Sequence, residues 1–128
     1  AYIDARITKT AQNNEKDFDM QRPSTPRHSG NIWTKYIITE GPLKHLGFGA
    51  GYNFVTERYG QVGRRTNTTV YPGYGLVNAV LYYKINQIQL QLNLNNVLNQ
   101  THWVGGYDKL RSFPGAPRNI NASVTYKF

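Results

Sequence analysis

Arginine and aromatic side chains gather in two stretches that are rich in glycine and proline, residues 59–73 and 102–117. Guanidinium groups supply directed hydrogen-bond donors to anions, and aromatic rings supply stacking and cation–π partners. An anionic, ring-bearing ligand is the chemistry that this combination suits. Our candidate binding residues are Arg64, Trp103, Tyr107 and Arg111. The alternative is that such arginines bind lipid phosphates or only keep the surface soluble.

Catalytic, metal and cofactor chemistry is not predicted. The chain of 128 residues has no cysteine, which excludes a thiol nucleophile and a cysteine-based zinc site. Its three histidines lie far apart and match no metal-ligand spacing. The acidic residues Glu15, Asp17 and Asp19 lack the rest of a calcium-binding loop, so a solvated acidic stretch is the better interpretation.

The elements that must position the candidates are β-strands. In residues 119–128, apolar and polar side chains alternate strictly, and the stretch ends on the aromatic residue Phe128. Alternation with period 2 indicates a strand with one apolar and one polar face. About ten residues is also the length of a tilted strand that crosses a bilayer.

Six segments share this alternation, and no segment has a sustained helical period. They predict an all-β chain of six antiparallel up-and-down strands, near 1–9, 30–39, 45–58, 74–85, 87–99 and 117–128. The connections between them run long, short, long, short, long. Long loops at one end and short turns at the other are typical of outer-membrane barrels.

The two faces of these strands have different chemistry. The polar positions hold mostly Asn, Gln, Gly, Ser and Thr, which suit a crowded lumen better than open water. The residues predicted to face lipid are Phe48, Tyr52, Phe54, Leu90, Leu92, Leu94, Val124 and Tyr126. The residues predicted to face the lumen are Asn53, Gln89, Gln91, Asn93 and Asn121.

The net charge of +8 raises the alternative of nucleic-acid binding by a small basic barrel. The basic residues cluster in the loops and the strand faces carry few of them, so nucleic acid is not a predicted partner. A lipocalin-like barrel needs about eight strands and an apolar interior. Six strands with two open edges cannot sit in lipid, because unpaired edge groups find no partner there. The sequence therefore predicts the carboxy-terminal part of a larger transmembrane β-barrel.

Several motifs resemble, in order and spacing, those of TonB-dependent siderophore receptors. They lie in residues 26–36, 46–52, 72–79, 92–99, 114–118 and 126–128. The chain departs from the family pattern at Asn78 and Asn99, where Asp is usual, and at Val97, where Leu is usual.

The resemblance implies a plugged barrel of about 22 strands in the bacterial outer membrane, with residues 1–128 as its last strands. It implies uptake of ferric siderophores, not enzymatic catalysis, with energy from the TonB complex, and a plug domain and earlier strands that precede Ala1. Further implied partners are outer-membrane lipid, lipopolysaccharide and the barrel assembly machinery, which would read Phe128 as an assembly signal. The alternatives are a receptor for cobalamin, haem or a glycan, and a passive porin.

Overall fold

The computed structural model describes residues 1–8, 19–60, 69–108 and 111–128, and places none of them in a helix. The described part of the chain thus contains no helix of the length and apolarity needed to cross a membrane. Two compact units can be distinguished. The loop unit comprises Ala1–Gly30, Phe54–Tyr74 and Thr101–Gly115, and the sheet unit comprises Asn31–Asn53, Gly75–Gln100 and Ala116–Phe128.

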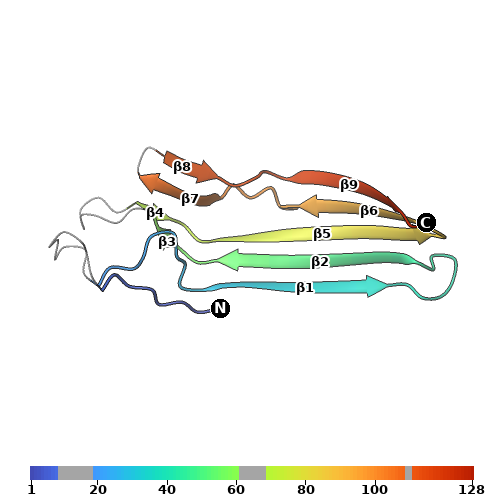
Figure 1. The fold of residues 1–128 in the computed structure, drawn as a ribbon, viewed down its shortest axis with the longest axis horizontal. Helices are drawn as coiled ribbons and strands as arrows, with labels where there is room; N and C mark the ends of the chain where they lie inside the picture. The colour runs from blue at the N-terminus through green and yellow to red at the C-terminus, as the bar shows by residue number, and fades with distance from the viewer. Residues whose placement is uncertain (9–18, 61–68, 109–110) are drawn as a thin grey trace. The chain divides into compact units, whose positions relative to one another are not determined.

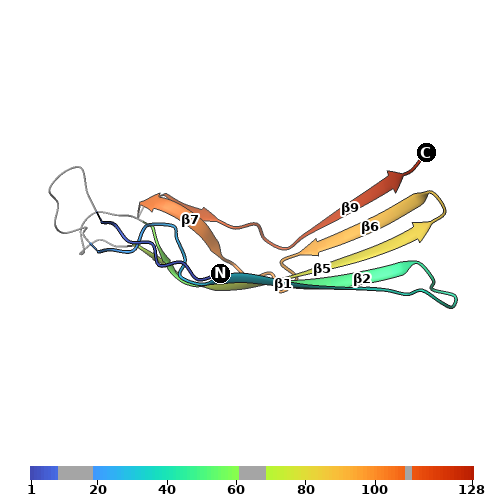
Figure 2. The same ribbon diagram turned by 60° about the horizontal axis from the view of Figure 1, so that its bottom comes forward.

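The main element is an antiparallel sheet whose neighbouring strands follow one another along the chain (Figures 1 and 2). Its strands, in sheet order, are β1 (Ser29–Ile37), β2 (Leu46–Val55), β5 (Tyr74–Ile85), β6 (Ile88–Asn95) and β9 (Asn119–Tyr126). The predicted all-β, up-and-down architecture is confirmed. Among the described residues, however, the sheet contains five strands and not the predicted six.

Strand β6 fixes the register of the sheet, because it pairs without interruption with β5 and with β9. Leu92 lies opposite Leu81 and Ala122, whereas the next residue, Asn93, lies opposite Val80 and Asn121. Successive side chains therefore separate into an apolar face and a polar face. The apolar face is exposed, with 42% of Leu92 accessible to solvent. The predicted separation of the two faces is confirmed.

Glycines on the polar face of β2 make room for aromatic rings of the neighbouring strands. A Cβ atom at Gly47 would overlap the ring of Tyr82, and one at Gly51 would overlap the ring of Trp33. Gly49 lies between them, against Val80. The groups that approach these glycines closely are thus side chains of the sheet itself.

The two short connections of the sheet are turns, as predicted. Gly41 and His45 in the β1–β2 connection have φ angles of 80° and 75°, and Asn86 between β5 and β6 has a φ of 51°. Asn96 also has a φ of 51°, and β6 ends just before it. The predicted strand over 87–99 was therefore too long at this end.

The Asn96 side chain holds that ending in place. Asn96 is buried, and its amide nitrogen donates to the carbonyl oxygens of Gln100 and Ala116 at 2.9 and 3.2 Å. Its side-chain oxygen accepts from the Gln100 N–H, and its own N–H donates to Oδ1 of Asn78. Asn78 stands where the family pattern has Asp, and its side-chain amide oxygen accepts the hydrogen bond from the Asn96 N–H.

The first predicted strand, over 1–9, was wrong for the described residues 1–8. These residues make two isolated antiparallel bridges, Tyr2 with His28 and Arg6 with Gln21, and no continuous strand. The partner segment contains Pro23 and Pro26 between those bridges. Proline lacks the N–H that a ladder needs, so alternation in residues 1–8 cannot produce regular pairing.

A charge on the apolar face should destabilise the barrel more than the same charge on the polar face. If the apolar face meets lipid near the bilayer midplane, Leu92→Arg should cost about 2–4 kcal/mol. Asn93→Arg is the matched control, since it introduces the same side chain one residue away on the other face. Denaturant unfolding of the full-length receptor from lipid vesicles measures both losses, and a larger loss for Asn93→Arg would show that the faces are reversed.

Adding a methyl group beneath the Trp33 ring should strain the polar face. Gly51→Ala should lower the free energy of unfolding by about 1–3 kcal/mol, because the ring cannot keep its position. In a Trp33→Ala background the same substitution should cost much less. A double-mutant cycle on the full-length receptor measures this coupling, and equal losses in both backgrounds would contradict the packing described above.

Candidate functional site

Two small hairpins in the loop unit lie in the stretches where the sequence predicted loops. One pairs β3 (Arg58–Tyr59) with β4 (Val70–Tyr71), and the other pairs β7 (Trp103–Asp108) with β8 (Arg111–Pro114). The β7–β8 pairing shifts register twice, around Gly105 and Gly106. Such shifts disturb the alternation of side chains, which is why sequence periodicity did not reveal this hairpin.

Tyr71 connects the two hairpins. Its side chain is buried, and its hydroxyl lies 3.0 Å from Oγ of Ser112 in β8. A Cβ atom at Gly106 would overlap this hydroxyl, so a residue without a side chain is required there. The β7–β8 hairpin is thus packed against β4.

Arg58 makes a second connection. Only 4% of this residue is exposed, and its guanidinium group donates to the carbonyl oxygen of Trp103 at the start of β7. The guanidinium carbon also lies 5.3 Å from the centre of the Tyr74 ring, within cation–π range. The Tyr74 ring in turn lies 4.6 Å from the ring of the buried His102. Arg58 therefore fixes the backbone on which one of the candidate binding residues sits.

Three of the four candidate binding residues lie on one hairpin. Trp103 begins β7 with 37% of its surface exposed, Tyr107 lies within β7, and Arg111 begins β8 and is exposed. Arg64 lies outside the described residues. The structure thus brings Trp103, Tyr107 and Arg111 onto one element. Their role in ligand binding stays a prediction.

Sequence reasoning missed the role of Arg58, which ends the predicted strand 45–58 and precedes the stretch 59–73. Its type and spacing resemble those of the exposed arginines, so the sequence holds no signal that would distinguish it. The distinguishing features are burial and the bond to the Trp103 carbonyl.

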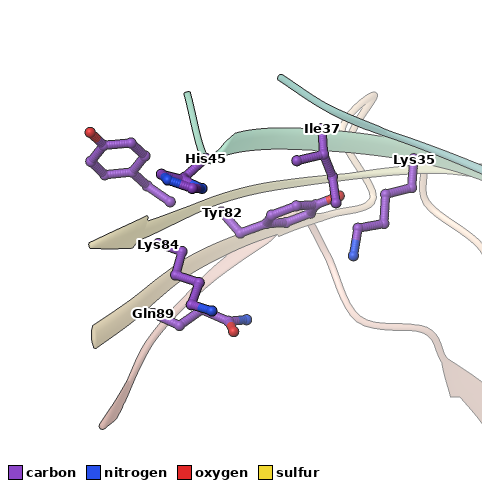
Figure 3. A pocket seen from close by; sticks show the side chains of 7 residues that line it. Lys35, Ile37, His45, Tyr82, Lys84 and Gln89 are labelled. Atoms are coloured by element: carbon purple, nitrogen blue, oxygen red, sulfur yellow. The ribbon is translucent and has the colours of Figure 1, made fainter. Parts of the chain in front are cut away.

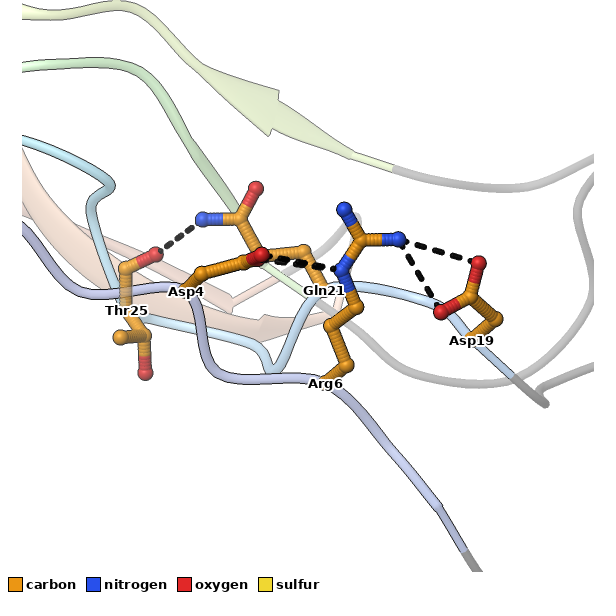
Figure 4. A network of polar contacts seen from close by, with 5 residues as sticks. All are labelled: Asp4, Arg6, Asp19, Gln21 and Thr25. Atoms are coloured by element: carbon orange, nitrogen blue, oxygen red, sulfur yellow. Dashed lines mark hydrogen bonds and ion pairs between the residues drawn. The ribbon is translucent and has the colours of Figure 1, made fainter.

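One residue of the acidic stretch, Asp19, forms an ion pair with Arg6. Nη1 of Arg6 donates to both carboxylate oxygens of Asp19 at 3.0 Å, and Nε donates to Asp4 at 3.1 Å (Figure 4). The hydrogen bond that Arg6 donates to Asp4, and then those that it donates to Asp19, raise the pKa of Arg6. Glu15 and Asp17 lie outside the described residues. Within the described ranges, no three His, Asp or Glu side chains are grouped so that they could hold a metal.

The family model described as TonB dependent receptor-like, beta-barrel matches residues 1–97. The chain is 31% identical over 133 residues to the metal-pseudopaline receptor CntO of Pseudomonas aeruginosa. This match covers 100% of this chain and 18% of that protein. It is 29% identical over 132 residues to the ferrioxamine B receptor of Salmonella typhimurium, covering 99% of this chain and 18% of that receptor.

A solved structure with the same arrangement is the siderophore receptor PiuA from Acinetobacter baumannii. The TM-score is 0.74 at 28% sequence identity, and the match covers 87% of this chain and 15% of that one. The chain therefore spans less than a fifth of the length of each of these proteins.

Removing the Arg58 guanidinium should loosen the β7–β8 hairpin without unfolding the sheet. In the full-length receptor, Arg58→Gln should speed hydrogen exchange of the β7 amides by an amount equivalent to about 1.5–3 kcal/mol, the range for a hydrogen bond to a charged group. Arg27→Gln is the control, since Arg27 is an exposed arginine of the same unit. Unchanged protection of β7 would show that Tyr71 alone holds the hairpin.

Proposed function

The chain belongs to the TonB-dependent receptor-like β-barrel family, and from this premise we propose that it is part of an outer-membrane receptor that takes up ferric siderophores. The observation that carries the proposal is the ligand class of the relatives. Their names specify metal-pseudopaline, ferrioxamine B and, for a relative from Escherichia coli that is 27% identical, catecholate siderophores. Energy for uptake would come from the TonB complex, through a plug domain in another part of the receptor.

The two faces of the sheet support this assignment. An exposed face of large apolar residues, opposite a face of Asn, Gln, Ser and Thr, is the pattern of a strand between lipid and lumen. In the full barrel, the apolar face would meet lipid and the polar face would meet the plug. Lipopolysaccharide and the assembly machinery are further proposed partners. Phe128 is fully exposed, with its ring 5.1 Å from that of Tyr126, and its reading by that machinery stays a prediction.

We place ligand binding on the β7–β8 hairpin and on Arg64. The exposed Trp103 and Arg111 suit an anionic chelate with aromatic or amide groups, since they offer a stacking surface and a directed cation. Loops on a rigid scaffold are where binding residues concentrate. Arg58 would act on the ligand through Trp103, as a positioning residue.

A receptor for cobalamin, haem or a glycan is the second candidate, and a passive porin is the third. The family membership favours a receptor over a porin. The names of the relatives favour iron and other metal chelates over the remaining nutrients.

Ligand binding should depend on the candidate residues. We expect the full-length receptor to bind ferrioxamine B or a ferric catecholate, and Arg64→Ala or Arg111→Ala to cost about 1.5–3 kcal/mol of affinity if the contact is direct and charge-assisted. The Trp103→Ala/Tyr107→Ala variant should also bind more weakly. Lys44→Ala, in the short β1–β2 connection, is the control.

Isothermal titration or intrinsic fluorescence quenching measures these affinities. If all three variants bind within about twofold of the parent, a difference well under 1 kcal/mol, the hairpin does not hold the ligand. If the parent binds haem or cobalamin but neither iron chelate, the second candidate function replaces the first.

A further inference from the structure

The five strands of the sheet contain two charged side chains, Lys35 in β1 and Lys84 in β5. Both lie on the polar face, since Lys84 pairs with Gln89 and Lys35 lies beside the ring of Tyr82. These strands carry no acidic residue at all. A face that otherwise holds amides, glycines, Val80 and the rings of Trp33 and Tyr82 thus carries two positive charges.

Both lysines line one cavity of about 160 Å³ within the sheet unit (Figure 3). His45, which precedes β2, lies on the same side, and Gln89 adds an amide. Nζ of Lys35 is 4.5 Å from the centre of the Tyr82 ring. The N–H of Lys84 donates to the carbonyl oxygen of His45 at 3.2 Å, which fixes the β1–β2 connection beside β5. The cavity therefore gathers positive charge on a fixed framework.

None of these positive charges is neutralised by a carboxylate of the described chain. The ion pairs found among the described residues are those of Arg6 in the loop unit. In addition, the hydroxyl of Tyr82 is buried and has no hydrogen-bond partner among the described residues. A buried hydroxyl without a partner is uncommon in native proteins. The cavity thus offers two ammonium groups to an acceptor that bears negative charge, beside a buried hydroxyl.

We propose that this cavity binds the carboxylate of an acidic side chain from another segment of the same receptor, held against the polar face. Like charges that line one cavity repel each other, and a carboxylate would relieve that repulsion and accept hydrogen bonds from the lysines. The two lysines lie on the face opposite Leu90 and Leu92, which disfavours a lipid headgroup as the source of the anion, and Ile37 and Tyr83 complete the lining of the cavity. Neighbouring amides such as Gln89 and Gln91 suit the backbone of a polypeptide.

The inference depends on family membership and on the cavity, not on the identity of the transported ligand. A receptor that bound no siderophore could still hold a carboxylate in this cavity. Conversely, loss of the cavity charges would not change the loop residues proposed to bind the chelate. The two proposals can therefore fail separately.

Zero-length crosslinking of the full-length receptor in outer-membrane vesicles tests the proposal. A water-soluble carbodiimide joins a lysine to a carboxylate only where the two are in contact, and mass spectrometry identifies the resulting amide bond. We expect amides from Lys35 or Lys84 to an Asp or Glu outside residues 1–128 of the same polypeptide. Their yield should exceed that at the exposed control Lys44 about fivefold, which corresponds to about 1 kcal/mol of ion-pair stabilisation.

A charge-reversal pair provides an independent measurement. Lys35→Glu/Lys84→Glu should lower the midpoint of thermal unfolding of the full receptor, whereas Lys44→Glu should not. An equal effect of the two variants, or the absence of amide bonds at both cavity lysines, would overturn the proposal. Amide bonds to a different protein would also overturn the proposal. So would a phospholipid that binds the parent receptor through its phosphate but does not bind the charge-reversal variant. Each result would identify another occupant of the cavity.

Discussion

Uninterrupted backbone pairing of β6 with both of its neighbours is the constraint on which the rest of the sheet depends. Because the pairing of β5, β6 and β9 has no bulge, alternate side chains of each strand lie on the same face of the sheet. Ala79, Leu92 and Val124 share this face. A slip of one residue in β6 would place its leucines among the amides of the opposite face. Pairing also satisfies the backbone N–H and C=O groups, which lipid cannot do.

The parts of the fold that sequence could predict are those governed by a single period. Strands β6 and β9 alternate so regularly that their faces, approximate ends and antiparallel order follow from residue types. Residues 1–8 show similar alternation, yet two prolines in the partner segment limit them to isolated bridges. Alternation therefore predicts which side chains share a face, but the donors of the neighbouring segment decide whether a strand forms.

The candidate site was predictable in composition but not in arrangement. Arginine and aromatic residues at 102–117 drew attention to this segment, and Trp103 and Arg111 do lie on one hairpin. The hairpin itself was hidden by two shifts of register near Gly105 and Gly106. Arg58 could not be distinguished at all, because its role depends on burial beside Tyr74 and on a carbonyl that is distant in sequence.

The placement of the two tryptophans has a practical consequence. Trp33 lies over Gly51 in the sheet unit, and Trp103 begins β7 in the loop unit. No other tryptophan occurs in these 128 residues, so each unit carries its own natural fluorophore. Within this segment, replacing either one with phenylalanine would leave a single emitter, whose spectrum responds to the polarity around one indole ring. Changes at the wall and changes at the loops would thus be observed as separate optical signals, without any attached dye.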